Sequence, residues 1–281
     1  MKAQSTATTA ERLDRLASLL VGRRTLVLSG AGISTESGIP DYRSPERLKR
    51  PRKPMLYQTF VSDELARRRY WARSVLGWQT IEGAVPNAGH QAVARLEAQG
   101  VSVGVITQNV DSLHQKAGSS EVLELHGSLS MILCLGCRTV VGRRALQRRL
   151  LDLNPDVAEA VVTIAPDGDS DVPDDLVTSF IVPECESCGG ILKPHVVFFG
   201  ENVPKERVVH SNELLARAQV LMVVGSSLAV MSGMRFVLAA LRHGKQVVII
   251  NDGPTRADEQ ATFKLEGRLG EVLPALAALL A

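Results

Sequence analysis

The sequence is poor in several residue types, and each shortage narrows the class of protein. Its 281 residues include four cysteines and two tryptophans, and aromatic residues make up only 4% of the chain. Lysine and arginine (32) nearly balance aspartate and glutamate (30), so the formal net charge is only +2. A dedicated nucleic-acid-binding protein needs concentrated basic surface. We therefore expect no direct nucleic-acid partner.

Long apolar stretches are also missing. No segment reaches the roughly 18 uninterrupted apolar residues of a membrane span, so we expect no membrane partner. Glu11, Arg12, Asp14 and Arg15 interrupt the N-terminal region before the apolar part of a secretory signal could form. These early acidic residues also argue against a mitochondrial transit peptide, and we expect a cytoplasmic protein. The sequence does not indicate the oligomeric state.

The most informative stretch is LVLSGAGISTESGIPDYRS, residues 26–44. A short apolar run leads into Gly30, Gly32 and Gly38 among small hydroxylated residues. A strand that enters a glycine-rich turn lets backbone N–H groups approach a pyrophosphate. The stretch therefore predicts a dinucleotide-binding turn, although Thr35 replaces the third glycine of the G-x-G-x-x-G pattern. A tight strand-to-helix turn without a ligand is the alternative.

Four apolar runs, at residues 26–28, 101–106, 220–224 and 247–250, are typical of buried parallel strands. Small or polar residues follow each run, and segments with helical periodicity, such as 11–21 and 59–78, separate them. This alternation predicts an α/β fold, a doubly wound, Rossmann-like parallel sheet that binds a dinucleotide along its carboxyl edge.

Two histidines stand near predicted strand ends. A lone histidine is more often structural than catalytic, but His126 would be a catalytic candidate if it lay beside Asn109 and Asp111. His195 belongs to the apolar segment LKPHVVFFGE. Such a segment could take a peptide by β-augmentation, and a buried strand is the alternative interpretation.

All four cysteines fall in two C-x-x-C pairs, Cys134 with Cys137 and Cys185 with Cys188. Four thiolates at this spacing predict one tetrahedral Zn²⁺ site, and nearby glycines suit the turns around the sulfurs. Disulfides are the alternative, which the lack of a secretory signal disfavours. Because four cysteines leave no position for water, the zinc should be structural.

These motifs, in this order, resemble the sirtuin family of NAD-dependent protein lysine deacylases. The resemblance covers nearly the whole chain and rests on GAGISTESGIPDYRS, TQNVDSLH, LHGS, CLGC with CESC, LKPHVVFFGE, GSSL and IIND. Finer features (YWAR, APDGD, SGMRF and GPTRAD) resemble the class II branch, which includes the mitochondrial sirtuin-four type. The resemblance implies NAD and Zn²⁺ as cofactors and acylated proteins or peptides as substrates.

The resemblance also implies roles for individual residues. His126 would be the general base, and Asn109 would orient water or ribose. NAD would be held by small and polar residues after the strands: Gly30, Ala31, Gly32, Ser34, Thr35, Asp41, Tyr42, Arg43, Gln108, Asn109, Val110, Asp111, Gly225, Ser226, Ser227, Asn251, Asp252, Gly253 and Leu269. The substrate would meet Tyr70, Arg73, His195, Val196, Val197 and Phe198.

The implied reaction moves the acyl group from lysine to ADP-ribose and releases nicotinamide. The acyl oxygen would displace nicotinamide at the ribose C1′, and His126 would then accept a proton from the ribose hydroxyls. Protein mono-ADP-ribosyl transfer is the alternative activity. A binding module without turnover is a third possibility, which the presence of both His126 and Asn109 disfavours. The spacing of Tyr70 and Arg73 suggests tolerance of acidic or long acyl chains, unless Arg73 is an ordinary surface residue.

Two domains are expected. Residues 1–44, 86–131 and 192–281 would form the large NAD-binding Rossmann-like domain. The small domain would combine a helical and cofactor-loop insertion (45–85) with the zinc-binding module (132–191). The proline-rich basic stretch 44–54 is either a solvated loop or a lid over the phosphates of the cofactor.

Overall fold

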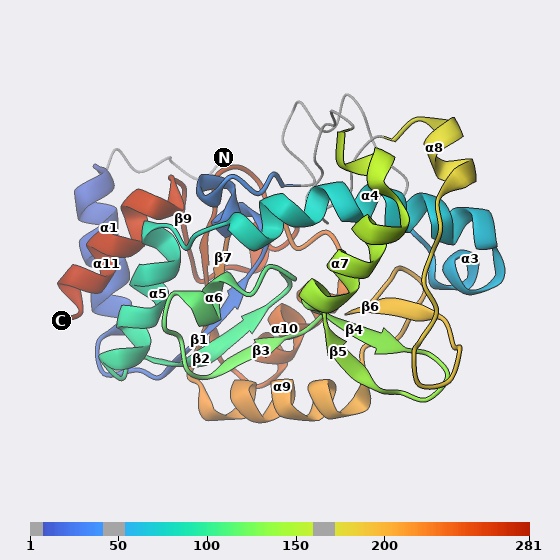
Figure 1. The fold of residues 1–281 in the computed structure, drawn as a ribbon. Coiled ribbons are helices and arrows are strands. Elements are labelled where there is room, and N and C mark those ends of the chain that lie inside the picture. Colours follow the sequence, from blue (N-terminus) through green and yellow to red (C-terminus); the bar gives the residue numbers. More distant parts are fainter. Residues whose placement is uncertain (1–7, 42–53, 160–171) are drawn as a thin grey trace.

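A six-stranded parallel sheet forms the centre of the computed structural model, which describes residues 8–41, 54–159 and 172–281 (Figure 1). Its strand order is β3-β2-β1-β7-β8-β9. The strands are β1 (Thr25–Ser29), β2 (Ser102–Thr107), β3 (Val122–Glu124), β7 (Val220–Val224), β8 (Gln246–Ile250) and β9 (Phe263–Leu265). The four predicted strands occupy the interior of this sheet, which confirms the predicted fold class.

Helices cover both faces of the sheet (Figure 1). One face carries α1 (Thr9–Leu20), α5 (Ala88–Ala98) and α11 (Leu269–Leu279), and the other carries α9 (Lys205–Arg217) and α10 (Met231–Arg242). Within β1, Val27 packs into the first core, whereas Leu26 and Leu28 pack into the second. Successive strand residues point to opposite faces, and because both faces are buried the strand is a continuous apolar run.

The region predicted as one helix at residues 59–78 contains two helices, α3 (Tyr57–Ser62) and α4 (Glu64–Gly83). The prediction of a single helix was wrong because Asp63 has an extended backbone between them. Its side chain accepts a hydrogen bond from the backbone N–H of Ala66 at 3.0 Å, so it caps the start of α4.

A second, antiparallel sheet has the order β5-β4-β6. Its strands are β4 (Gly127–Cys134), β5 (Val140–Gly142) and β6 (Leu192–Val196). It shares one apolar core with α3, α4, α7 (Arg143–Leu153) and α8 (Asp174–Ser179), and that core includes Phe60, Trp71, Ile132, Leu146, Leu192 and Phe198. This smaller unit is built from two insertions, one between β1 and β2 and one between β3 and β7, and the second insertion carries all four cysteines.

The remaining described elements are short: η1 (Ala31–Ser37), α6 (Leu113–Lys116), η2 (Pro155–Glu159) and η3 (Asp258–Gln260). Among the described helices, none combines the length and the apolar character needed to cross a lipid bilayer. Tyr42, Arg43 and residues 44–53 of the basic loop lie outside the described residues.

Candidate active site

The predicted site lies at the topological switch point of the large sheet, between β1 and β7, where the strand order reverses. Strand β1 pairs with β2 on one side and with β7 on the other, all in parallel. The connection after β1 leads to α5 on one face of the sheet, and the connection after β7 leads to α10 on the other face. Ligands in open α/β sheets bind outside the carboxyl ends of the strands at such a point.

The glycine-rich turn after β1 packs directly on the turn after β7. The backbone N–H of Gly30 donates to the carbonyl of Val224 at 3.0 Å, and that of Gly32 donates to the carbonyl of Gly225 at 2.8 Å. A Cβ atom on Gly32 would lie 2.9 Å from the Cα of Gly225, so the two turns can approach only without side chains. Glycine is thus required here for packing, and a pyrophosphate would have to bind other donors than these two N–H groups.

A buried polar cluster connects the ends of β1 and β2. The hydroxyl of Ser34 donates to Asp111 Oδ2 at 2.7 Å, and the Asn109 amide donates to Ser34 Oγ at 3.0 Å and to the Gly30 carbonyl at 3.1 Å. All three side chains are at least nine-tenths buried. The structure therefore brings together three of the residues predicted for the NAD site.

His126 lies beside this cluster, between β3 and β4. Its Nδ1 is 2.9 Å from the carbonyl oxygen of Gln108, and its Nε2 is 2.8 Å from the hydroxyl of Ser232. A carbonyl only accepts, so Nδ1 carries the proton and Nε2 is the basic nitrogen of the neutral ring. Burial lowers the pKa of His126 below 6.5, against the hydrogen bond to Gln108, and the charges of Arg207 and Arg235 lower it further. The ring is thus a neutral base near pH 7.

Ser232 and Gly233 were missed as site residues. Both stand in the first turn of α10, and a Cβ atom on Gly233 would lie 2.5 Å from Gln108 Oε1. The missing side chain lets this turn approach Gln108, which brings the Ser232 hydroxyl to His126. The sequence SGMRF contained the signal, but a serine at a helix start is ordinarily a cap, and 106 positions separate it from His126.

The other predicted NAD residues line the same edge. Ser226 Oγ accepts from the Gln108 amide at 2.8 Å, and Thr35 Oγ1 donates to the Gly32 carbonyl at 3.0 Å. Asn251 Nδ2 donates to the carbonyls of Asp252 and Gly253 at 3.2 and 3.1 Å. The remaining described members of the predicted set are Ala31 in η1, Asp41 after it, Val110 after β2, Ser227 after β7 and Leu269, whose side chain lies against Gly225.

Two buried histidines that were not predicted as site residues lie beneath the cluster. His114 Nε2 is 2.8 Å from Ser29 Oγ, His90 Nε2 is 3.5 Å from Ser34 Oγ, and the two ring centroids are 5.0 Å apart. Burial lowers the pKa of His114 to about 3, and that of His90 to about 4 against the opposing effect of Asp111. Both rings are therefore neutral at physiological pH.

The four cysteines form one cluster at the end of β4 and in the turn before β6. Their sulfur atoms all lie within 4.8 Å of one another, with Cys134 and Cys188 3.5 Å apart and Cys137 and Cys185 3.8 Å apart. A tetrahedral zinc with Zn–S bonds of about 2.3 Å requires sulfurs roughly 3.8 Å apart. The set therefore fits Zn²⁺, as predicted.

The predicted substrate segment continues from β6. The backbone N–H of Val197 donates to the carbonyl of His126 at 2.8 Å, which ties the segment to the histidine. Phe198 is buried against Phe60 and Tyr70, with centroids 5.2 and 5.3 Å apart, whereas the adjacent Phe199 is 51% exposed. Phe199, which follows β6 and forms an isolated bridge with Leu56, therefore leaves its side chain exposed next to the buried ring of Phe198.

The other predicted substrate residues lie on α4 and β6. Tyr70 and Arg73 lie one turn apart on α4, and Val196 ends β6. His195 Nε2 is 3.4 Å from Arg207 Nη2. Burial lowers the pKa of His195, and the charge of Arg207 lowers it further.

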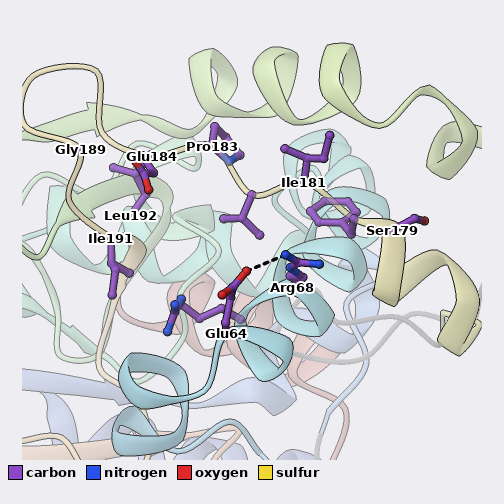
Figure 2. Close-up of a pocket in the computed structure, with 12 residues that line it drawn as sticks. Glu64, Arg68, Ser179, Ile181, Pro183, Glu184, Gly189, Ile191 and Leu192 are labelled. Carbon is purple, nitrogen blue, oxygen red and sulfur yellow. Dashed lines mark hydrogen bonds and ion pairs between the residues drawn. The ribbon is translucent and has the colours of Figure 1, made fainter.

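A hollow of 310 Å³ lies away from these residues, between α4 and the segment 179–192 (Figure 2). None of the residues that line it belongs to the predicted site. Its arginines have partners, since Arg68 pairs with Glu64 at 2.6 Å and Arg67 donates to the carbonyls of Phe60 and Val61.

Fold and site together define an α/β nucleotide-binding protein with an inserted four-cysteine metal module. Comparison with known proteins makes this specific: the model of the Sir2 family matches residues 30–232. NAD-dependent protein deacetylase 1 of Streptomyces coelicolor is 54% identical over 252 residues, which cover 90% of this chain and 84% of the relative.

Solved structures agree. A Sir2 homologue in complex with NAD has a TM-score of 0.73 at 30% identity, covering 95% of this chain and 93% of that one. A Sir2 protein bound to acetylated peptide has a TM-score of 0.71 at 30% identity, covering 93% and 95%. The chain belongs to the Sir2 family.

Proposed function

We propose that this protein is an NAD-dependent protein deacetylase in which His126 is the general base. Membership of the Sir2 family supports the activity, and the Streptomyces coelicolor relative is named for the same activity. The observation that carries the residue assignment is the pair of contacts at the His126 ring, one at each nitrogen.

The chemistry of His126 follows from those contacts. Because Gln108 holds Nδ1–H, only Nε2 can take a proton from a substrate hydroxyl. The Ser232 hydroxyl occupies that nitrogen, and a ribose hydroxyl would take its place. A neutral imidazole beside the ribose suits proton transfer near pH 7, since its lowered pKa leaves Nε2 free of a proton.

The polar cluster would hold the nicotinamide and ribose side of NAD. NAD, when bound, supplies ADP-ribose as the acyl acceptor and nicotinamide as the leaving group. Asn109 would orient ribose or water, and Asp111, fixed by Ser34, would accept from the carboxamide. The turns after β1, β7 and β8, with Leu269 against Gly225, would border the remainder of the dinucleotide.

The four cysteines would hold a structural Zn²⁺. They join β4, which begins directly after His126, to the turn before β6. The metal would therefore brace the small domain and keep both strands in register. The predicted domain boundaries remain a proposal; β4 begins before residue 132, and β6 lies entirely after residue 191.

The substrate would be an acetylated protein or peptide that lies along Val197 and Phe199. Two observations support this: β6 is an edge strand of the small sheet, and Phe199 points outward beside the segment tied to His126. A peptide backbone can add to such an edge. A Sir2 protein of the same fold binds acetylated peptide.

The finer assignment is the class II branch, supported by the motifs YWAR, APDGD, SGMRF and GPTRAD. The contact of Tyr70 with Phe198 of the proposed substrate segment supports a role for Arg73, which follows Tyr70 one turn later on α4. We propose that Arg73 favours acidic or long acyl chains. The variant Arg73→Met should lower the rate on glutaryl peptide relative to acetyl peptide; unchanged relative rates on acetyl, glutaryl and lipoyl peptides would refute this.

The deacetylase assignment is tested by mass spectrometry of an acyl-lysine peptide panel incubated with the protein and NAD. We expect loss of the acyl group, O-acyl-ADP-ribose as product, and neither in the His126→Ala variant. ADP-ribose attached to protein without deacylation would point to the transferase instead. No nicotinamide release with any peptide would refute both enzyme assignments.

We also propose that the protein is cytoplasmic, as expected from the sequence. Fractionation of cells of the native host tests this location.

A further inference from the structure

Lys193 is a buried lysine to which the reaction above gives no role. It stands in β6, and its side chain is only 2% exposed. Its Nζ lies 2.9 Å from Glu201 Oε2 and also donates to the carbonyl of Val196. Lysine is almost never fully buried unless it is paired, and Glu201 is the partner that permits the burial of Lys193. The question is what this buried ion pair does.

The pair closes the turn that carries the proposed substrate segment. Lys193 binds the carbonyl of Val196, and Glu201 Oε2 accepts from the backbone N–H of Phe198 at 2.9 Å. The N–H of Glu201 donates in turn to the carbonyl of Phe198 at 3.0 Å. The Lys193 ammonium also lies 4.5 Å from the centroid of the Phe198 ring. The two charges thus fix the backbone on both sides of Val197.

The backbone conformation of residues 196–201 determines which groups a bound peptide would contact. Val197 is tied to the carbonyl of His126, Phe198 is drawn into the aromatic cluster that contains Tyr70, and Phe199 is left facing outward. A buried ion pair is weak evidence for stability, because loss of hydration offsets most of the attraction. Its directional hydrogen bonds, however, select one backbone conformation for residues 196–201.

We propose that Lys193 and Glu201 are positioning residues that hold residues 196–201 in the conformation that receives the acylated peptide. The proposal rests on the proposed deacetylase function. It predicts that loss of the pair weakens peptide binding while NAD binding is retained, because the described NAD residues lie at the ends of the large sheet, and none of these described residues has a hydrogen bond or ion pair with the pair.

The test uses the double variant Lys193→Met/Glu201→Gln. Removing both charges together avoids leaving a buried charge unpaired, which would itself destabilise the fold. The control, Glu121→Gln/Arg217→Met, removes an ion pair of 3.5 Å whose side chains are 36% and 51% exposed. For each protein, kcat and KM for an acetyl-lysine peptide are measured, with peptide Kd from fluorescence anisotropy and NAD Kd from calorimetry.

We expect peptide KM and Kd to rise about tenfold in the double variant, as for a binding segment that must be ordered on association. We expect NAD Kd, the melting temperature and the control variant to change little, and Lys193→Arg to retain most of the peptide affinity. Unchanged peptide Kd in the double variant would overturn the proposal. So would parallel losses of peptide affinity, NAD affinity and melting temperature, which indicate a general structural role. A wild-type protein that binds the peptide without deacetylating it would instead refute the proposed function.

Discussion

The buried pair His90 and His114 makes stability depend on pH in a calculable way. In the folded protein the pKa values are about 4 and about 3, against 6.5 for an ordinary histidine. As pH falls below 6.5, the unfolded chain takes up protons that the folded protein excludes, so the free energy of unfolding decreases. This loss continues until the pH reaches the folded pKa values.

The magnitude follows from the same values. Each pH unit between the folded and unfolded pKa costs about 1.4 kcal/mol per histidine. From pH 7 to pH 5 each ring therefore costs about 2 kcal/mol, and the pair about 4 kcal/mol. Small proteins are stable by only about 5–15 kcal/mol, so the effect is large.

Urea unfolding at pH 7, 6 and 5 measures this effect in wild-type protein and in the variant His90→Gln/His114→Gln. Protonation of carboxylates and of zinc ligands also changes stability, but these groups are common to both proteins. The difference between their pH dependences therefore isolates the two histidines. His243→Gln, at an exposed position, is the control and should follow wild type.

We expect wild type to lose about 4 kcal/mol more than the double variant between pH 7 and pH 5. Equal losses in the two proteins would show that the buried rings titrate as in the unfolded chain. Burial would then not exclude protons from the two rings.

Three further outcomes are expected. Gly233→Ala places a Cβ atom 2.5 Å from Oε1 of the Gln108 side chain, so it should displace that amide from Ser226 in the predicted NAD site; deacetylation should fall by about 10–100-fold, and an unchanged kcat would contradict this. Ser232→Ala should lower neither deacetylation nor nicotinamide exchange, because a ribose hydroxyl would replace the Ser232 hydroxyl at His126 Nε2; a large loss of deacetylation would refute this replacement. Chelation of zinc should abolish activity and expose the small-domain core to a fluorescent dye, both reversed by added Zn²⁺; full activity without metal would contradict a bracing role.

Much of the fold was predictable because local and tertiary signals agree. The interior strands of the large sheet are apolar on both faces, as in Leu26, Val27 and Leu28. Short continuous apolar runs of this kind are typical of buried parallel strands. The cysteine cluster was predictable because paired C-x-x-C spacing has few alternatives. The short edge strand β9 was not predicted: its three residues have Lys264 at the centre, and only pairing with β8 makes them a strand.

The polar part of the site was only partly predictable. Asn109, Asp111 and His126 stand at strand ends, and residues at the carboxyl ends of parallel strands commonly bind ligands. Ser232 could not be assigned, because its role depends on Gly233 permitting a close approach to Gln108. His90 and His114 were missed because burial, which sets their pKa values, is not a property of the sequence around them. The identical neighbours Phe198 and Phe199 could not be told apart from the sequence, because only the folded chain packs Phe198 against Phe60 and Tyr70 and leaves Phe199 exposed.

The position of β1 at the centre of the large sheet has a consequence for how the chain is made. Its neighbour β7 begins only at Val220, so one edge of β1 stays unpaired while most of the polypeptide is synthesised. An apolar strand with an open edge is a site for pairing with other chains. Nascent or prematurely terminated chains that end before Val220 should therefore aggregate, and the ribosome-bound protein should depend on chaperones until β7 emerges.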